Sequence, residues 1–343
     1  MNNSIFNNKN ILVLGGTGTI GSAIVRELLD HHPKVIRVFS RDENKQFQMQ
    51  QEVGSFHNVR FLLGDIRDLD RLKRAMEGID IVFHTAALKH VVACEYNSFE
   101  AVKTNIVGTQ NVIDCAIEKG VKIVLFTSSD KAVNPNNAMG TSKLMAERLM
   151  IAANQHRGPR STIFYNVRLG NVTGSRGSVI PLFLDQIRKG GPLTLTSSAM
   201  TRYVMTLKET VEFLFDTISI AKGGEIFIKK IPALNISDMA EVLMELVGKK
   251  VPVETIGIKM GEKSYEELVG AEERSRTLET EQMYVIYPSE EILQESLRSQ
   301  YLIGKLLSEK QWLECSSHRA TLLNRGEIKN FLENNHLHSH PAS

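Results

Sequence analysis

An acid and an amine stand side by side at Asp130 and Lys131, directly after a segment typical of a buried strand. The run from Ile123 to Phe126 is apolar and rich in β-branched and aromatic side chains, as strands of parallel sheets are. In open α/β sheets, ligands bind at the carboxyl ends of the strands. An isolated Asp-Lys pair is usually a solvent-exposed ion pair, but this position favours acid–base chemistry on a substrate.

A second amine, Lys143, is predicted to reach the same place. The segment from Met139 to Ala153 contains good helix formers and has no Gly or Pro after Gly140, which predicts a helix. Met139 and Lys143 are four residues apart, so they share one face of its first turn, which points back toward the strand. Two lysines and one aspartate would therefore surround the same crevice.

The amino-terminal segment predicts a dinucleotide-binding turn. The strand-like run from Asn10 to Leu14 is followed by a glycine-rich turn and then by apolar residues at helical spacing. In such a turn one glycine permits the tight bend, the next lets the backbone approach a pyrophosphate, and the third lets the helix pack against the strand. The predicted cofactor contacts here are Gly15, Thr17, Gly18, Thr19, Ile20 and Gly21.

Ser40 and Arg41 follow the next predicted strand, Val35 to Phe39, and favour NADP over NAD. A hydroxyl group followed by arginine suits the 2′-phosphate of NADP, whereas an acidic residue at this place would bind the ribose hydroxyls of NAD. Asp42 keeps NAD possible, because a different path of the loop would present its carboxylate.

Two further strands are predicted at Val59 to Leu63 and at Ile79 to Phe83. Small or polar residues follow both of them, and small side chains leave room for a cofactor along the strand ends. The residues expected to contact the cofactor there are Asp65, Ile66, Ala86 and Ala87.

Shorter elements are predicted after residue 160. Strands are expected at 161–169, 225–229 and 253–258, and helices at 208–221 and 238–247. Ser237 is the expected N-cap of the second of these helices, and Gly248 is its expected stop.

Several longer blocks resemble one enzyme family: residues 86–91, 100–105, 129–135, 170–181 and 261–263. Over roughly residues 8–288, the chain resembles the extended short-chain dehydrogenase/reductases. Among them it is similar to the UDP-N-acetylglucosamine 4,6-dehydratases of polysaccharide biosynthesis that invert C5. The resemblance implies an α/β fold, with a Rossmann-type doubly wound parallel sheet and a smaller mixed α/β substrate-binding domain.

The resemblance also implies a division of the chain. Residues 1–170 would bind NADP, with 203–222 rejoining that domain, and 171–288 would form most of the substrate-binding domain. Residues 289–343 form a carboxyl-terminal extension to which we assign no role. Its tail holds His336, His338 and His340, which we expect to be solvated, and we predict no metal site.

The implied reaction moves hydride from C4 of the sugar to NADP⁺ and later back to C6, with loss of water from C5 and C6. Asp130 would be the acid and Lys131 the base, while Ser129 would bind the C4 oxygen and Lys143 the nicotinamide ribose. Burial and the nearby cationic Lys143 are expected to lower the pKa of Lys131, so that its amine is neutral.

Further contacts are carried over from the matching blocks. Lys89 and Asn105 are expected at the cofactor, and Lys89 also at the UDP-sugar. The other expected substrate contacts are Met139, Asn171, Arg176, Ser178, Val179, Arg202, Lys259 and Glu262. Similar enzymes have arginine at the position of Lys259, and lysine cannot bind a phosphate bidentately.

Met139 stands where the wider superfamily has the tyrosine of a Tyr-x-x-x-Lys motif. A thioether is only a weak acceptor for the proton of the C4 hydroxyl group. We therefore predict that Lys131 accepts this proton too, and that Met139 packs beside the sugar. Two alternatives remain: a nucleotide-sugar 4-epimerase, which normally needs the tyrosine, and a catalytically silent NADP-binding protein, which the intact Asp130–Lys131 pair opposes.

Composition sets the remaining expectations. The 343 residues are 42% hydrophobic and carry a net charge of +2, which supports a full core and argues against nucleic-acid binding. Three widely spaced cysteines predict reduced thiols. With neither an export signal nor a long apolar run, we expect a cytoplasmic protein that does not enter a membrane. We also expect it to form a homo-oligomer, either a dimer or a hexamer.

Overall fold

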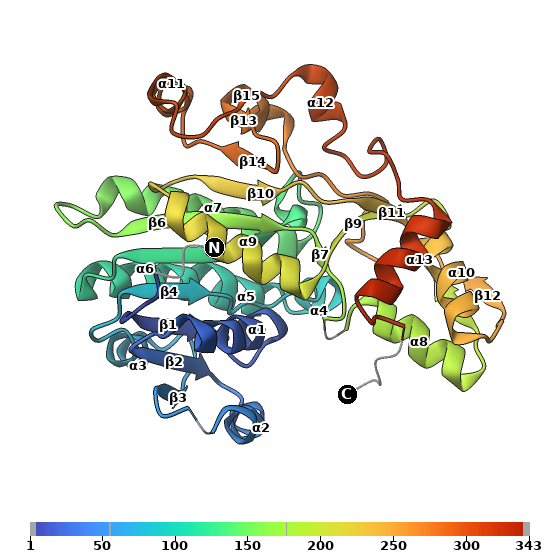
Figure 1. Ribbon diagram of the computed structural model, residues 1–343, viewed down its shortest axis with the longest axis horizontal. Coiled ribbons are helices and arrows are strands. Elements are labelled where there is room, and N and C mark those ends of the chain that lie inside the picture. Colours follow the sequence, from blue (N-terminus) through green and yellow to red (C-terminus); the bar gives the residue numbers. More distant parts are fainter. Residues whose placement is uncertain (1–4, 55, 176, 339–343) are drawn as a thin grey trace.

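The computed structural model describes residues 5–54, 56–175 and 177–338. Within them the central sheet has ten strands in the order β15-β13-β14-β10-β6-β5-β4-β1-β2-β3 (Figure 1). Its parallel strands are β1 Asn10–Leu14, β2 Val35–Ser40, β3 Val59–Leu63, β4 Ile81–His84, β5 Ile123–Ser129, β6 Ile163–Leu169 and β10 Ile226–Lys229. The antiparallel strands at one edge are β14 Met283–Ile286, β13 Thr277–Glu279 and β15 Lys305–Leu306.

The strand order reverses between β1 and β4. The chain runs outward through β2 and β3, then crosses back so that β4 pairs with the other side of β1. Both strands are buried on both faces, as their continuous apolar runs predict. Ligands of doubly wound sheets bind at such a reversal, so this topology indicates where a ligand would bind.

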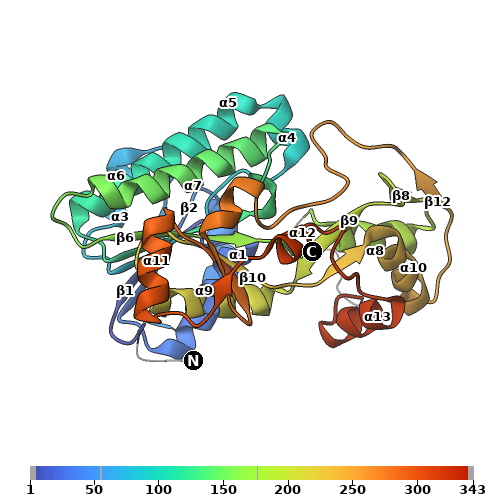
Figure 2. The same ribbon diagram turned by 90° about the horizontal axis from the view of Figure 1, so that it is seen from above.

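Helices cover both faces of the sheet (Figure 2). On one face, α3, α6 and α7 pack through a core that includes Leu72, Val112 and Met150. On the other face, α1 and α9 pack against each other through residues such as Ile24 and Leu214. The bounds are α1 Thr19–Leu28, α3 Leu69–Ala75, α6 Gly108–Lys119, α7 Ala138–His156 and α9 Leu207–Ile220.

A second body lies beyond the carboxyl ends of the strands (Figure 1). It is built from α8 Val179–Lys189, α10 Ile236–Val247, α13 Arg325–Asn334, β8 Leu193–Leu195 and β12 Val253–Thr255. All of these elements except the exposed β12 contribute to a separate apolar core that includes Phe183, Leu243 and Ile328. A three-stranded sheet lies between the two bodies, formed by β7 Asn171–Val172, β9 Thr201–Met205 and β11 Ala233–Asn235.

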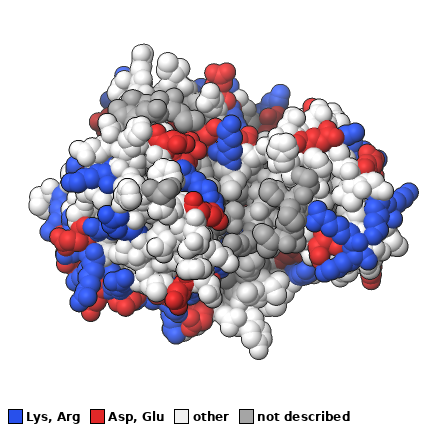
Figure 3. All heavy atoms as spheres, turned by 60° about the horizontal axis from the view of Figure 1, so that its bottom comes forward, with Lys and Arg blue, Asp and Glu red and all other residues white. Residues whose placement is uncertain are grey.

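The remaining elements are shorter or peripheral. The helices are α2 Glu43–Val53, α4 Val91–Tyr96, α5 Ser98–Ala101, α11 Glu290–Ser299 and α12 Glu309–Leu313. A π-helical segment, Val102–Val107, joins α5 to α6, and 3₁₀ turns occupy Leu29–His31, Asp130–Ala132 and Ala271–Arg276. Figure 3 shows acidic and basic side chains interspersed over the described part of one face.

The doubly wound α/β fold is confirmed, with two local corrections. Ser237 does not cap α10, because Asn235 Oδ1 accepts hydrogen bonds from the backbone N–H groups of Ser237 and Asp238 and starts the helix at Ile236. The strand expected at 253–258 ends at Thr255, where its parallel pairing with the three residues of β8 ends. The division of the chain into domains at residue 170 stays a prediction, although α9 does pack on the main sheet and β10, β13 and β14 extend it.

A buried ion network joins three of these elements. Arg168 on β6 is almost fully buried, and its Nε and Nη2 donate to the two carboxylate oxygens of Glu147 on α7, at 3.1 and 2.7 Å. Its guanidinium also donates to both oxygens of Glu273, at 2.9 and 3.0 Å, and to the carbonyl of Leu268 at 2.8 Å. The charge of Arg168 lowers the pKa of Glu273 to about 2, despite burial.

We predict that Arg168→Met lowers the free energy of unfolding by about 3 to 5 kcal/mol, because two buried carboxylates lose their shared cation. Urea unfolding measures the change. Arg325→Met is the matched control: Arg325 pairs with Asp238 and Glu241 at the surface, so its loss should cost no more than about 1 kcal/mol. Equal effects of the two substitutions would contradict a structural role for the buried network.

Candidate active site

The predicted acid and base meet at the carboxyl end of β5. Asp130 is completely buried, and its Oδ1 accepts hydrogen bonds from Ser129 Oγ at 2.8 Å and from Lys131 Nζ at 2.9 Å. Lys131 Nζ also donates to Oδ1 of Asn171 at 3.0 Å. Four side chains that we predicted at the site are therefore in direct contact, and β7 places the asparagine.

A second carboxylate completes this cluster. Glu266 is 2% exposed, and its Oε1 lies 3.3 Å from Lys131 Nζ and 4.0 Å from Arg202 Nε. The guanidinium of Arg202 itself donates to the carbonyls of Thr201 and Lys263. Oδ2 of Asp130 and Oε2 of Glu266 are buried and have no hydrogen-bond partner among the described residues. The site therefore holds two carboxylates around one ammonium group.

The expected lowering of the pKa of Lys131 is wrong. Burial alone would lower it, but the charges of Asp130 and Glu266 outweigh burial, so the pKa of Lys131 is raised. Lys143 is not among the groups that act on it; the nearby cation is Arg202. The amine of Lys131 is thus an ammonium ion at rest, and it needs a place to leave its proton before it can act as a base.

Lys143 is the lysine whose pKa falls. It is 6% exposed, its Nζ donates to the carbonyl of Thr127 at 2.8 Å, and it lies 4.5 Å from the centre of the Phe126 ring. Burial lowers the pKa of Lys143 to about 8. Met139, one turn earlier on α7, is 2% exposed and packs with Cys94 and other residues of α4 and α5.

The glycine turn closes tightly between β1 and α1. Gly15 has a φ of +76°, and a side chain there would come within 2.8 Å of the backbone nitrogen of Ala86. A side chain at Gly21 would meet the carbonyl oxygen of Gly15 at 2.3 Å. Gly18 is the N-cap of α1 and has no side chain, so no side-chain hydrogen bond caps the amino end of this helix. Thr17, Thr19 and Ile20 belong to the same turn and first helical turn.

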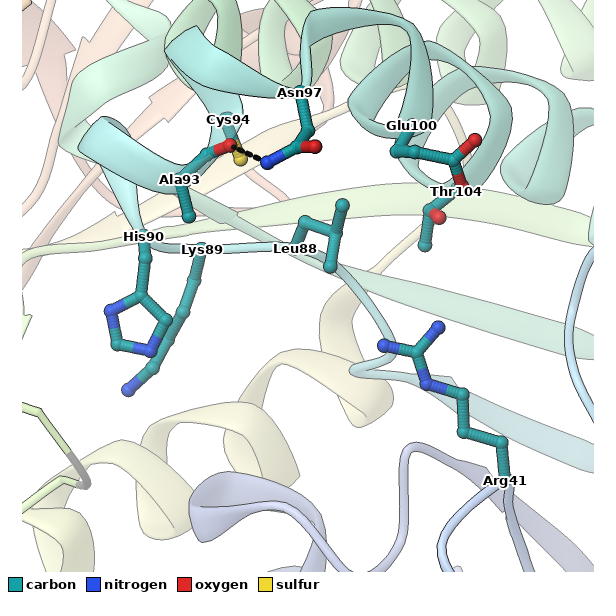
Figure 4. A pocket seen from close by; sticks show the side chains of 9 residues that line it. All are labelled: Arg41, Leu88, Lys89, His90, Ala93, Cys94, Asn97, Glu100 and Thr104. Atoms are coloured by element: carbon teal, nitrogen blue, oxygen red, sulfur yellow. Dashed lines mark hydrogen bonds between the residues drawn. The ribbon is translucent and has the colours of Figure 1, made fainter.

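Arg41 extends from the end of β2 into a cavity of about 290 Å³, where Leu88, Lys89 and Thr104 are among the lining residues (Figure 4). Its guanidinium lies 3.6 Å from Asp65, which Arg67 also binds at 2.8 Å. Ser40 accepts a hydrogen bond from Gln46.

Asp42, the residue that kept NAD possible, is the N-cap of α2. Its side chain accepts from the backbone N–H of Lys45 and pairs with the Lys45 amine at 2.7 Å. This arrangement uses the Asp42 carboxylate within its own helix.

Asn105 acts within the protein scaffold. It is 1% exposed and binds both backbone groups of Leu88, with its Oδ1 accepting and its Nδ2 donating, as well as Ser142 Oγ. It thereby fixes the segment that carries Ala86, Ala87 and Lys89, of which Lys89 lines the cavity. Ile66 is also buried, and it packs against Gly108, where any side chain would clash with that of Ile66.

The remaining predicted substrate residues lie on loops around α8 and the 259–263 segment. Ser178 and Val179 begin α8, and Ser178 Oγ is buried without a hydrogen-bond partner among the described residues. Arg176 lies outside the described residues. Lys259 is exposed and donates its backbone N–H to Glu262, whose carboxylate is 4.0 Å from Arg202.

Sequence reasoning missed Glu266. It lies beside Glu267, and no sequence pattern indicates which of these two carboxylates is buried. Only the tertiary contacts of Glu266 with Lys131 and Arg202 identify it. In the part of the chain that the structure describes, no group of His, Cys, Asp and Glu residues could hold a metal ion.

A doubly wound sheet with a glycine turn at the strand reversal is the fold of the short-chain dehydrogenase/reductases, and this chain adds an Asp-Lys pair at the end of β5. The sequence profile of the polysaccharide biosynthesis protein family matches residues 11–288, and the chain belongs to this family. Its relatives include the UDP-N-acetylglucosamine 4,6-dehydratase (inverting) of Campylobacter jejuni, 44% identical, with 83% of this chain and 84% of that protein covered.

Other similar proteins carry different names. The UDP-glucose 4-epimerase of Rickettsia prowazekii is 42% identical, with 79% of this chain and 81% of that protein covered. Pen from Bacillus thuringiensis, whose X-ray structure is known, is 44% identical in sequence to this chain. The two structures superpose with a TM-score of 0.90 over 97% of this chain and 99% of that chain. Structures that hold NAD, such as a dTDP-glucose 4,6-dehydratase of Streptomyces venezuelae at 24% identity and a TM-score of 0.69, share the fold.

A Methanocaldococcus jannaschii protein, 50% identical over 83% of this chain and 87% of its own length, is described as an uncharacterized membrane protein. In this chain, none of the helices within the described residues combines the length and apolar character that crossing a bilayer requires. The cytoplasmic location stays a prediction.

We predict that Lys143→Met stabilises the protein at neutral pH and that this gain shrinks as the pH rises from about 8 to 10.5. In that range the unfolded chain still carries the proton that folded Lys143 has lost, so the wild-type protein gains stability with rising pH while the variant does not. Urea unfolding at several pH values measures the difference. A gain that is independent of pH would contradict the lowered pKa.

Proposed function

We propose that this protein converts UDP-N-acetylglucosamine to a UDP-4-keto-6-deoxy sugar with inversion at C5. The observation that carries the proposal is the hydrogen-bonded cluster of Ser129, buried Asp130 and half-buried Lys131, which is bound to Asn171 at the end of β5. It stands in a chain that is 44% identical to dehydratases named for this reaction.

The cofactor of the proposed reaction is NADP. The backbone-lined turn from Gly15 to Gly21 is a cradle that side chains would fill, and the amino end of α1 favours a pyrophosphate. Arg41 would bind the 2′-phosphate, and Lys143 the nicotinamide ribose. The chemistry that NADP supplies when bound is the removal of hydride from C4 and its return at C6.

The residues of this chain handle the protons. Ser129 would donate to the C4 oxygen, and Lys131 would accept the C4 hydroxyl proton because Met139 cannot. The ketone at C4 acidifies the proton at C5, which Lys131 removes in turn. Asp130 gives a proton to the departing C6 hydroxyl group, which leaves as water. The buried, water-poor surroundings of Asp130 strengthen each of these interactions.

A UDP-sugar 4-epimerase is the second candidate, because the Rickettsia relative that is 42% identical to this chain is named a UDP-glucose 4-epimerase. An epimerase leaves the mass of its substrate unchanged, whereas the proposed reaction removes one water. Incubation with UDP-N-acetylglucosamine followed by mass spectrometry therefore decides between the two. A product of unchanged mass would refute the dehydratase proposal.

We expect Arg41→Ala to weaken binding of NADP by about 10- to 100-fold and to change binding of NAD little. A hydrogen bond to a charged group contributes about 1.5 to 3 kcal/mol, and the 2′-phosphate exists in NADP alone. Titration of both cofactors measures the effect. Arg67→Ala, which removes the other arginine bound to Asp65, is the control, and equal losses of NADP and NAD in Arg41→Ala would refute the assignment.

Lys131→Met should stop both oxidation at C4 and loss of water, while UDP-N-acetylglucosamine still binds. General-base losses are on the order of 10² to 10⁴-fold or more. Single-turnover absorbance of the reduced cofactor tests the first step, and mass spectrometry tests the second. Met139→Leu, which replaces one apolar side chain with another of similar volume, should keep most activity. Reduced cofactor accumulating in Lys131→Met would show that another group accepts the C4 proton.

A further inference from the structure

We propose that Glu266 is a second proton acceptor for Lys131, which allows this one amine to take two protons from the sugar in a single turnover. The inference rests on the proposed function, because it assigns a role within that reaction. Glu266 touches the amine of Lys131, so it acts through that residue and is a positioning residue of the site.

The need for a second acceptor follows from proton counting. The proposed reaction releases two protons from the sugar, one from the C4 hydroxyl group and one from C5. It takes up two, one in the departing water and one on the opposite face of C5. Because Met139 cannot accept a proton, Lys131 must accept both of the protons that the sugar releases. The amine must therefore first donate the proton it carries at rest, and later donate the C4 proton, to other groups. Two unloading steps require two acceptors.

The structure places two carboxylates at the required positions. Lys131 Nζ lies 2.9 Å from Asp130 Oδ1 and 3.3 Å from Glu266 Oε1. Each carboxylate keeps one buried oxygen that has no hydrogen-bond partner within the described parts of the chain. Both carboxyl groups can therefore hold a proton without breaking an existing hydrogen bond on that second oxygen.

The steps balance in protons and charge. The ammonium proton of Lys131 moves to Glu266; the neutral amine takes the C4 hydroxyl proton and passes it to Asp130. The amine then takes the C5 proton while Asp130 protonates the departing hydroxyl group. Glu266 finally releases its proton to solvent, and solvent protonates the opposite face of C5. NADP, when bound, would supply the transfer of hydride from C4 to C6, so no outside oxidant would be consumed.

The charges around Glu266 suit this role. The ionisable groups that act on it are Lys131, Asp130, Arg202 and Lys263. Burial and the charge of Asp130 outweigh the cations, so the pKa of Glu266 is raised. A carboxyl group that protonates more easily than usual is a better acceptor from an ammonium ion.

The carboxyl-terminal segment holds Glu266 in place. Ser317 lies between α12 and α13, and its Oγ accepts the backbone N–H of Glu266 at 3.0 Å. In return, the backbone N–H of Ser317 donates to the Glu266 carbonyl at 2.8 Å, and Leu268 donates to the Cys315 carbonyl at 2.9 Å. In Figure 1 this segment runs from the edge of the main sheet to the second body.

The test compares Glu266→Gln with Glu266→Asp in the full chain with NADP and UDP-N-acetylglucosamine. The glutamine cannot take a proton, so Lys131 must lose its own proton to solvent. We expect water loss to fall by about 10²-fold or more at neutral pH and to recover up to about tenfold per pH unit. Aspartate should restore the pH profile of the wild-type protein at a lower rate. Glu225→Gln, at a buried carboxylate outside the site, is the control and should keep the wild-type profile.

A second measurement does not use turnover. Acylation of Lys131 by acetic anhydride, followed over pH by peptide mass spectrometry, reports the pKa of its amine. Loss of the negative charge in Glu266→Gln should lower that pKa, so labelling begins at lower pH than in the wild-type protein. Ser317→Ala removes the hydroxyl group that accepts the backbone N–H of Glu266. This variant should shift the pH profile of activity in the same direction as Glu266→Gln, and it replaces that variant in the test if Glu266→Gln does not fold.

The outcomes separate the inference from the proposed function. A wild-type protein that removes no water from UDP-N-acetylglucosamine refutes the function. An active wild-type protein with an unchanged profile in Glu266→Gln refutes the inference alone. Equal losses in the glutamine and aspartate variants at every pH, or unchanged labelling of Lys131, would reduce Glu266 to a structural residue and would also overturn the inference.

Discussion

The buried guanidinium of Arg168 is the constraint on which the geometry of the site depends. A charge this deep is tolerated only when carboxylates and carbonyls surround it, and Glu147, Glu273 and Leu268 do so. Glu147 lies one helical turn after Lys143, and Leu268 lies two residues after Glu266. One ion network therefore sets the register of α7 and of the 266–273 segment against the sheet, and with them the positions of Lys143 and Glu266 in the candidate site.

The two lysines of the site have opposite environments. Lys143 faces a carbonyl and an aromatic ring, so burial dominates and the pKa of its amine falls to about 8. Lys131 faces Asp130 and Glu266, so the carboxylates dominate and its pKa rises. This difference suits a division of tasks in which Lys143 binds while Lys131 exchanges protons with its neighbours, since an ammonium between carboxylates has somewhere to send its proton.

Several features that depend on local sequence patterns were predicted correctly. Apolar runs and glycine spacing located β1, β3 and α7, and adjacency in the chain located Asp130 and Lys131. Contacts between distant segments were not predictable in this way. The pKa of Lys131 was predicted in the wrong direction because the charge of its neighbour Asp130 offsets much of the effect of burial, and Glu266, which is 135 positions away in the chain (266 − 131), raises this pKa further. The motif around Asn105 predicts a cofactor contact, but it does not predict the hydrogen bonds that Asn105 makes to the backbone of Leu88.

The carboxyl-terminal extension illustrates the same limit and gives the site its last element. The family match ends at residue 288, and nothing in the composition of 289–343 indicates a catalytic connection. In the structure β15 pairs with β13, α13 packs against α10, and the strand-like contact of 315–317 with 266–268 lies between them. The backbone of Glu266 is therefore held by residues that lie beyond the family match. Such support matters because a buried carboxylate stays opposite an ammonium group only if its backbone is fixed.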